Sequence, residues 1–184
     1  MTGVLGRCLG AQLQAASLGA DVYRGAAAEV GVLAVDLTPA AVEDPVSSAL
    51  PRRFDALQWH GDTFDLPVGA VQLARSQACE QQAFVFKRAY GLQFHIEIDA
   101  ARATEWGDVP AYAQSLRELL GPDGLSTIVE QVRRKERTST ELARRLFAPA
   151  RTHGRSRHAG RLAHVRPQPE GQPPGEGAEQ ARAR

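Results

Sequence analysis

The stretch that most constrains the fold is residues 3–12, where a short apolar run meets a Gly-x-Cys-x-Gly turn and a helical pattern begins at once. Gly6 and Gly10 stand two residues before and after Cys8. Glycines at these places let a strand turn sharply into a helix, which lifts the side chain between them above the sheet. The positive end of a helix favours a thiolate, so Cys8 is predicted to be a nucleophile. The alternative is a small buried cysteine in an ordinary strand–helix turn.

Length and composition are typical of one globular domain. The chain has 184 residues, 43% hydrophobic and 23% charged, with two cysteines, Cys8 and Cys79. No apolar run approaches the roughly 18 residues of a membrane span, and the start of the chain has no signal-peptide pattern. We therefore expect a cytoplasmic protein that does not bind membranes. Two cysteines form no disulfide framework, and Cys79, which has no glycine turn beside it, is expected to be structural.

Hydrophobic patterning predicts an α/β protein that begins with a strand, a turn and a helix. Strands are expected at residues 21–25, 30–37, 54–59, 71–76, 82–87 and 90–95. The last two are close enough for a hairpin, and the strand at 54–59 is expected to deliver His60 to a turn. A loop with one short helical turn is expected at 40–53, a helix at 111–120, and one long or two shorter amphipathic helices at 125–147. Residues 54–95 are more typical of antiparallel than of parallel pairing.

The composition changes after Ala148 to Pro, Gly, Arg, His and Gln. We expect a domain over residues 1–147 and a disordered tail over 148–184, since the tail has too little apolar surface to order itself. From Arg151 onward the tail carries seven Arg and three Glu, a net charge of +4. Because interleaved aromatic residues are missing, a solvated extension is favoured over nucleic-acid binding.

A second chemical signal is His95-Ile96-Glu97. Side chains alternate along a strand, so the imidazole and the carboxylate are expected to share one face. A carboxylate in that position orients a general base and stabilises its charged form. The alternative is a strand-end His-x-Glu on a solvated face.

The same residue types could instead hold a metal ion. That hypothesis would use Cys8, His60, Asp62, His95 and Glu97. No Cys-x-x-Cys or His-x-x-x-His spacing supports it, so we expect neither a metal nor another cofactor.

Three motifs stand out: Gly6-Arg7-Cys8-Leu9-Gly10-Ala11-Gln12, Gln58-Trp59-His60-Gly61-Asp62 and Gly91-Leu92-Gln93-Phe94-His95-Ile96-Glu97. Together they resemble the class I (triad) glutamine amidotransferases, most closely stand-alone proteins related to the glutaminase domain of GMP synthase. They stand in the family's order and the resemblance spans about residues 3–147. It implies a flavodoxin-like sandwich with C-terminal helices.

The resemblance also implies roles for individual residues. Cys8 would attack the side-chain amide of glutamine and form a γ-glutamyl thioester, releasing ammonia. His95 would shuttle protons and Glu97 would orient His95. The backbone N–H of Leu9 would donate to the oxyanion. The substrate's other contacts would come from Gln12, Gly61 and Asp62.

The sequence departs from the family's pattern in two places. The family's nucleophile turn lies well inside the domain, whereas here it follows Met1 by six or seven residues. We therefore expect a fold incomplete at its N-terminus: a truncated gene product, or a chain whose true start lies upstream. The strand at Val4 and Leu5 would then have an unpaired edge and the first helix an uncovered apolar face. Ile96 replaces a frequent proline, but its side chain faces away from the His95–Glu97 side.

Three functions follow. The first is glutamine hydrolysis, with ammonia passed to a synthetase or acceptor on another chain, because no P-loop or second catalytic domain is present. The second is hydrolysis of another γ-glutamyl compound by the same triad. The third is a non-catalytic remnant that binds a partner, although the intact Cys8, His95 and Glu97 oppose it.

Overall fold

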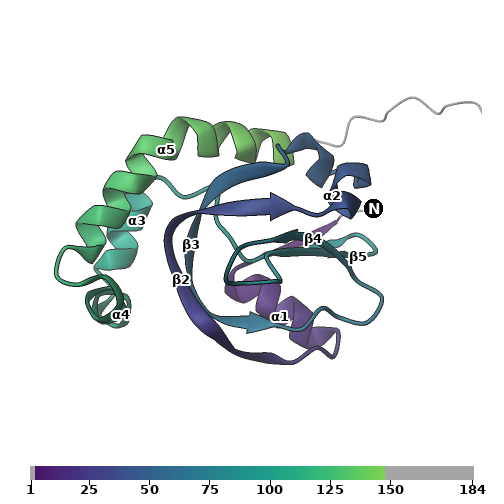
Figure 1. The fold of residues 1–184 in the computed structure, drawn as a ribbon, viewed down its shortest axis with the longest axis horizontal. Coiled ribbons are helices and arrows are strands. Elements are labelled where there is room, and N and C mark those ends of the chain that lie inside the picture. The colour runs from purple at the N-terminus through teal and green to yellow at the C-terminus, as the bar shows by residue number, and fades with distance from the viewer. Residues whose placement is uncertain (1–2, 148–184) are drawn as a thin grey trace, which may run out of the picture. The chain divides into compact units, whose positions relative to one another are not determined.

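A mixed six-stranded sheet forms the centre of the computed structural model, which describes residues 3–147 (Figure 1). The strands are β1 (Val4–Arg7), β2 (Val22–Leu37), β3 (Arg53–Phe64), β4 (Val71–Arg75), β5 (Ala83–Phe86) and β6 (Ala89–Leu92). The helices are α1 (Leu9–Ser17), α2 (Pro39–Glu43), a 3-10 turn η1 (Ser47–Ala49), α3 (Ala100–Gly107), α4 (Pro110–Leu120) and α5 (Gly124–Phe147). The sheet order is β1-β6-β5-β4-β2-β3; β1 and β6 pair in parallel and the other four pairs are antiparallel. The expected α/β class and the antiparallel character of residues 54–95 are confirmed.

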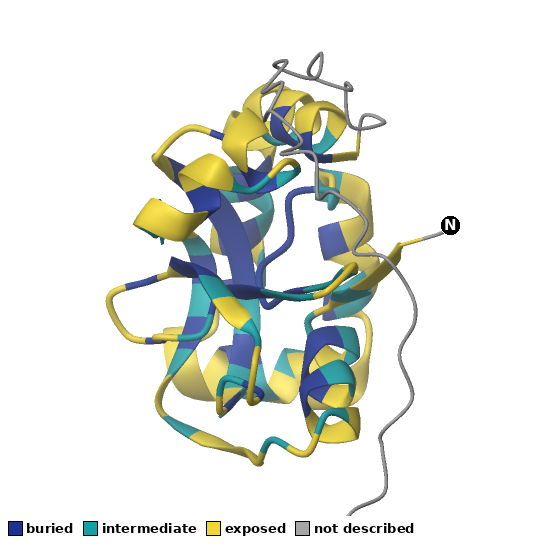
Figure 2. Cartoon of the chain, turned by 90° about the vertical axis from the view of Figure 1, so that its right-hand side faces the viewer, coloured by how far each residue is buried: buried dark blue, intermediate teal, exposed yellow. Residues whose placement is uncertain are grey.

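The long strands β2 and β3 curl strongly, with α1 on one side of the pair and α3 and α4 on the other (Figure 1). Helix α5 contributes to two hydrophobic clusters. Its first half packs Ile128 and Val132 beside Leu57, and its second half packs Leu142 and Leu146 beside Phe54. Because each half buries residues four apart, both present the same kind of apolar stripe. Figure 2 shows buried residues along the strands and on the inner sides of the helices.

The parallel pair β1–β6 positions the functional residues. Gly6 stands opposite Gly91 and Arg7 opposite Leu92. The backbone N–H of Cys8 then donates to the carbonyl of Leu92 at 2.7 Å. Because parallel strands end at the same edge of a sheet, the turn after β1 lies beside the segment that follows β6.

The strands expected at 21–25 and 30–37 are a single strand, β2, interrupted by an irregularity between Arg24 and Glu29. This irregularity brings Glu29 opposite His60 on β3. The expected turn at His60 is therefore wrong, because β3 continues through it to Phe64. Pairing with β3 on both sides of the irregularity, at residues 22–24 and 29–36, keeps β2 continuous across it.

Helices α4 and α5 match the expected helices, and α5 is one helix of 24 residues. The hairpin of β5 and β6 is also confirmed. Helix α3 was not expected from the sequence; it begins where the Asp99 side chain accepts a hydrogen bond from the N–H of Arg102 at 2.7 Å. The expected tail at 148–184 lies outside the described residues.

One edge of the sheet carries exposed apolar side chains. Strand β1 is the terminal strand and pairs with β6. Val4 and Leu5 on β1 and Leu9 and Leu13 on α1 are all exposed. The expected open strand edge and uncovered helix face are thus confirmed. Within residues 3–147, no helix has the length and apolar character needed to cross a bilayer.

Candidate active site

Cys8 occupies a strained turn between β1 and α1. Its φ of 48° and ψ of −114° lie outside the conformations that L-residues ordinarily adopt. A Cβ added to Gly6 would lie 2.5 Å from the carbonyl oxygen of Gly10, so the turn requires glycine at position 6. The space beside the α-carbon of Gly10 is open, so the second glycine meets no such constraint. The Cys8 side chain makes no capping bond to α1, which leaves the sulfur available to other partners.

His95 lies beside this turn on the segment after β6. Its backbone pairs with Leu57 of β3 through two hydrogen bonds, of 2.9 and 3.0 Å. The ring packs edge-on against Trp106 of α3, with 5.0 Å between the centroids. These contacts bury the imidazole and fix its orientation.

The ring of His95 joins Cys8 to Glu97. Nδ1 lies 2.8 Å from Oε1 of Glu97, and the ring also interacts with the Cys8 side chain, which contributes to the raised pKa of His95. Since Nδ1 is engaged by Glu97, Nε2 is the nitrogen that remains for the sulfur. The structure thus brings together the three residues that the sequence singled out, in the order Cys8, His95, Glu97.

The electrostatics of His95 and Glu97 are coupled. Burial disfavours the charged imidazole, but the hydrogen bonds to Cys8 and Glu97 outweigh it and raise the pKa of His95 to about 9. Burial also disfavours the Glu97 carboxylate, yet the bond to His95 and the charge of Arg7 hold its pKa below the usual value. At neutral pH the pair is therefore an imidazolium and a carboxylate.

Arg7 is a site residue that the sequence reasoning missed. Its Nη1 lies 2.8 Å from Oε1 of Glu97. A second contact holds the other carboxylate oxygen, which accepts the N–H of Ile96 at 3.0 Å. Arg7 directly precedes Cys8 in the sequence, but its partner stands 90 positions further on, so local pattern did not reveal the contact.

Gln12, Asp62 and Gln93 form a polar wall next to Cys8. Nε2 of Gln12 donates to the Asp62 carbonyl at 3.1 Å and to Oε1 of Gln93 at 3.3 Å. Nε2 of Gln93 in turn lies 3.7 Å from the sulfur of Cys8. Gln93 stands inside one of the three motifs but received no role from the sequence. Gly61 lies within this stretch of β3, where an added Cβ would meet the guanidinium of Arg24 at 2.8 Å.

The five metal-ligating residues considered from sequence do not form one group. Among the described residues, one set of three could offer ligand atoms within 4.8 Å of one another: Glu29, His60 and Cys79. Cys79 is buried, and burial raises the pKa of its thiol. Of the five residues considered from sequence, His60 belongs to this set of three, and Cys8, Asp62, His95 and Glu97 do not.

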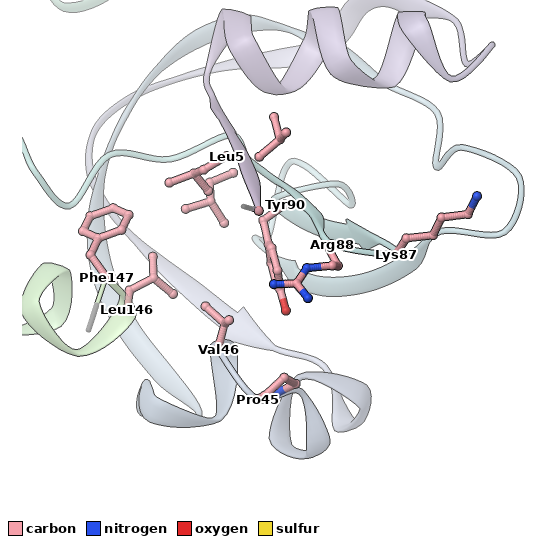
Figure 3. Close-up of a pocket in the computed structure, with 11 residues that line it drawn as sticks. Leu5, Pro45, Val46, Lys87, Arg88, Tyr90, Leu146 and Phe147 are labelled. Carbon is pink, nitrogen blue, oxygen red and sulfur yellow. The ribbon is translucent and has the colours of Figure 1, made fainter. Parts of the chain in front are cut away.

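A cavity of about 590 Å³ lies near the other end of β1 (Figure 3). Leu5, Tyr90 and Phe147 are among the side chains that surround it, and Val46 faces it from the segment before η1. Cys8, His95 and Glu97 are not part of its lining. The cavity is therefore separate from the Cys8 site.

Comparison with known proteins agrees with this geometry. The family described as glutamine amidotransferase class-I matches residues 2–105. The chain belongs to the class-I glutamine amidotransferase family.

Three sequence relatives show which members of this family the chain resembles. The chain is 40% identical over 96 residues to a glutamine-hydrolyzing GMP synthase of Thermomicrobium roseum, covering 52% of this chain and 18% of that protein. It is 36% identical over 98 residues to one subunit of the glutamine-hydrolyzing GMP synthase of Thermococcus kodakarensis, covering 52% of this chain and 50% of that relative. A putative glutamine amidotransferase-like protein of Salmonella typhimurium is 30% identical over 128 residues, which are 69% of this chain and 53% of that protein. The chain thus spans about half the length, or less, of these relatives.

Solved structures show the same fold. A glutamine amidotransferase of Thermotoga maritima superposes with a TM-score of 0.68 at 38% identity, covering 77% of this chain and 59% of that one. A glutamine amidotransferase of Methylobacillus flagellatus gives a TM-score of 0.68 at 27% identity, covering 85% and 67%. The expected class I amidotransferase fold is confirmed.

Proposed function

We propose that this chain hydrolyses the side-chain amide of glutamine through a triad of Cys8, His95 and Glu97. The observation that carries the proposal is the placement of the His95 ring, which interacts with the Cys8 side chain and whose Nδ1 lies 2.8 Å from Oε1 of Glu97. A nucleophile, a base and a group that orients the base are the parts that covalent acyl transfer needs. The strained turn at Cys8 supports the same function, since strain of this kind gathers at nucleophiles.

In the proposed reaction the Cys8 sulfur, as a thiolate, attacks the side-chain carbonyl carbon of glutamine. The backbone N–H of Leu9, at the start of α1, donates to the oxyanion that forms. The C–N bond then breaks while the His95 imidazolium gives its proton to the leaving nitrogen, so that ammonia departs and a γ-glutamyl thioester remains. His95 next takes a proton from water, whose oxygen adds to the thioester. The C–S bond breaks, which releases glutamate and restores the thiolate.

Glu97 keeps its negative charge through these steps. It holds Nδ1 of His95, so that Nε2 is the nitrogen that exchanges protons with the reacting groups. Gln12, Gly61 and Asp62 are proposed to hold the amino-acid end of the substrate. This assignment is supported by their position: Gln12 and the Asp62 carbonyl are hydrogen-bonded to each other beside Gln93 and Cys8.

We further propose that the ammonia serves an acceptor on a separate polypeptide. Support comes from the likeness to a relative whose name makes it one subunit of a GMP synthase, which implies that a second polypeptide completes that enzyme. Residues 1–147 would form the amidotransferase-like domain, with the segment at 148–184 outside it.

The test is covalent labelling of the 184-residue chain with a diazoketone analogue of glutamine, read by peptide mass spectrometry. One adduct is expected, on Cys8, and excess glutamine should slow its formation. Cys8→Ala should remove the adduct, while Cys79→Ala, at the other cysteine, should leave it intact. A folded sample that takes no label, or takes it equally on both cysteines, would contradict the proposal. A sample that takes no label would favour a non-catalytic binding protein.

A further inference from the structure

A buried polar cluster lies next to Asp62, on the side of the site that is proposed to hold the amino-acid end of glutamine. Glu29 on β2 stands opposite His60 on β3, and their Oε2 and Nε2 atoms are 3.4 Å apart. The same Glu29 oxygen accepts hydrogen bonds from Oγ of Ser76 at 2.9 Å and from Nε2 of Gln82 at 2.7 Å. All four side chains are buried, so these bonds replace water that the groups have lost.

The direction of each hydrogen bond follows from the carboxylate, which can only accept. Gln82 must turn its amide nitrogen to Glu29, which leaves its oxygen to accept from Nε2 of Gln58 at 3.0 Å. Gln58 must then turn its own oxygen toward Nε2 of His60, at 3.1 Å. Two acceptors, from Gln58 and Glu29, therefore face one nitrogen of the ring.

The other nitrogen of His60 also faces an acceptor. Nδ1 lies 3.1 Å from the carbonyl oxygen of Asp62. Neutral imidazole has one N–H, so it would leave one of these contacts without a proton. With both nitrogens protonated, His60 satisfies every acceptor around it and forms a buried ion pair with Glu29. Burial opposes the charge of Glu29, but hydrogen bonds from His60, Ser76 and Gln82 hold its pKa below the usual value, so Glu29 acts as an acceptor.

The Asp62 carbonyl connects this ion pair to the site. It accepts from Nδ1 of His60 and also from Nε2 of Gln12 at 3.1 Å. Gln12 continues to Gln93, and Gln93 to the sulfur of Cys8. A charged donor behind the carbonyl fixes its direction more firmly than a neutral donor, because charge-assisted hydrogen bonds are about twice as strong.

We propose that the Glu29–His60 ion pair is a positioning unit that holds the Asp62 carbonyl, and through it Gln12 and Gln93, in the arrangement that receives the amino-acid end of glutamine. This inference rests on the proposed glutamine hydrolysis. It gives His60 a role at a distance from the reacting atoms, and it gives Glu29, which no motif contained, a role of its own.

A metal ion is the competing occupant of this cluster, since Cys79 also comes within reach of Glu29 and His60. The contacts of Cys79 favour the ion pair instead. Its sulfur lies 3.3 Å from Oγ1 of Thr63 and donates toward the Gln81 carbonyl at 3.7 Å, so it already has hydrogen-bond partners within the fold. Zinc binding is therefore made an outcome of the test.

The first measurement is the protonation of the His60 ring by ¹H–¹⁵N NMR of the full chain at pH 7, with the signals assigned through their loss in His60→Gln. Two ring N–H groups are expected. A single N–H, with the other nitrogen bare, would overturn the ion pair. This measurement needs neither substrate nor activity, so it stands even if the chain takes no label.

The second measurement compares two electrophiles on Glu29→Gln, which keeps the shape and removes the charge. With the diazoketone analogue of glutamine, the concentration that gives half-maximal inactivation should rise about tenfold to a hundredfold, since loss of a hydrogen bond to a charged group weakens binding by about that factor. The maximal inactivation rate and the rate with iodoacetamide, which has no amino-acid end, should change by less than about threefold. A fold that is merely weakened would slow or speed both reagents together.

Cys79→Ser is the matched control, because it changes the neighbouring side chain without touching the hydrogen-bonded series. It should label like the parent chain. Stoichiometric zinc binding by the parent chain that is lost in Cys79→Ser would overturn the inference in favour of a metal site. If the parent chain is labelled but Glu29→Gln has an unchanged half-maximal concentration, the positioning role fails while the proposed hydrolysis stands. If the parent chain takes no label, both fail, and the His60 spectrum alone reports whether the ion pair exists.

Discussion

Arg7 and His95 bind the same oxygen of Glu97: Nη1 of Arg7 and Nδ1 of His95 each lie 2.8 Å from Oε1. The carboxylate therefore faces two cations, one of them partly open to solvent and the other buried. Both favour its ionised form, so the charge of Glu97 is maintained by Arg7 as well as by His95.

Replacing Arg7 tests this sharing. In Arg7→Gln we expect the pKa of Glu97 to rise, because one of its two cations is gone, while the bond to His95 keeps it below that of a free glutamate. Carboxyl ¹³C NMR titration measures it directly. Arg102→Gln is the control, since Arg102 pairs with Glu105 on the surface of α3. An unchanged titration of Glu97 in Arg7→Gln would show that the shared oxygen has no energetic consequence.

The raised pKa of His95 predicts a dependence of stability on pH. The folded state binds this proton more tightly than the unfolded state, whose ordinary value is 6.5 against about 9 in the fold. The contribution is therefore complete below pH 6.5 and is lost as the pH rises through 9. It corresponds to roughly 3 kcal/mol, at about 1.4 kcal/mol for each pH unit of difference. Urea unfolding at pH 6, 7.5 and 9 should show the parent chain losing its advantage over His95→Gln. Parallel curves for the two proteins would contradict the prediction.

The backbone of Cys8 predicts an unusual preference for glycine. Its φ of 48° disfavours any side chain with a Cβ, so Cys8→Gly should be more stable than Cys8→Ala by about 1–2 kcal/mol. Chemical denaturation of the two variants measures the difference. At Gln14 on α1 we expect the opposite order. Gln14→Gly should be less stable than Gln14→Ala by about 1 kcal/mol, because glycine destabilises the interior of a helix. Equal stability of the two Cys8 variants would mean that the turn relaxes when sulfur is removed.

The hairpin between β5 and β6 also contains a non-glycine residue with a positive φ. Phe86 pairs with Ala89, so Lys87 and Arg88 form a two-residue turn, and Lys87 has a φ of 55°. Lys87→Gly should raise the free energy of unfolding by up to about 1 kcal/mol, since glycine adopts positive φ without strain. Lys87→Ala is the comparison that keeps the strain but removes the long side chain. A thermal midpoint no higher for Lys87→Gly than for Lys87→Ala would argue against a strained turn.

The parts of the fold that sequence predicts well are those with local signals. The turn at Cys8, the hairpin, α4 and α5 each follow from glycines, spacing or apolar periodicity within a few residues. Helix α3 was missed because it is short and has one large apolar residue, Trp106, although Asp99 stands at its start as a capping signal. The single strand β2 was missed because residues 25–28, with one glycine and three alanines, have little strand preference of their own.

The residues of the site also differ in how far the sequence predicts them. Cys8, His95 and Glu97 follow from motifs, and the structure brings them together, although β6 ends at Leu92 and His95 and Glu97 therefore lie beyond the strand that was expected to carry His95. Arg7 and Glu29 could not be predicted, because each is defined by a partner far along the chain. The contact of Glu29 with His60 depends on an irregularity in the pairing of β2 with β3. No short stretch of sequence predicts where that irregularity falls.

Within residues 3–147, strand β1 has four residues and one neighbouring strand, yet its pairing with β6, together with the packing of α1, keeps Cys8 beside His95. The site is therefore assembled only while these four residue pairs between β1 and β6 remain intact. If these pairs opened, Cys8 and His95 would separate while the antiparallel strands remained folded. Amide exchange in residues 4–8 would then report how often the site assembles, independently of how stable the rest of the molecule is.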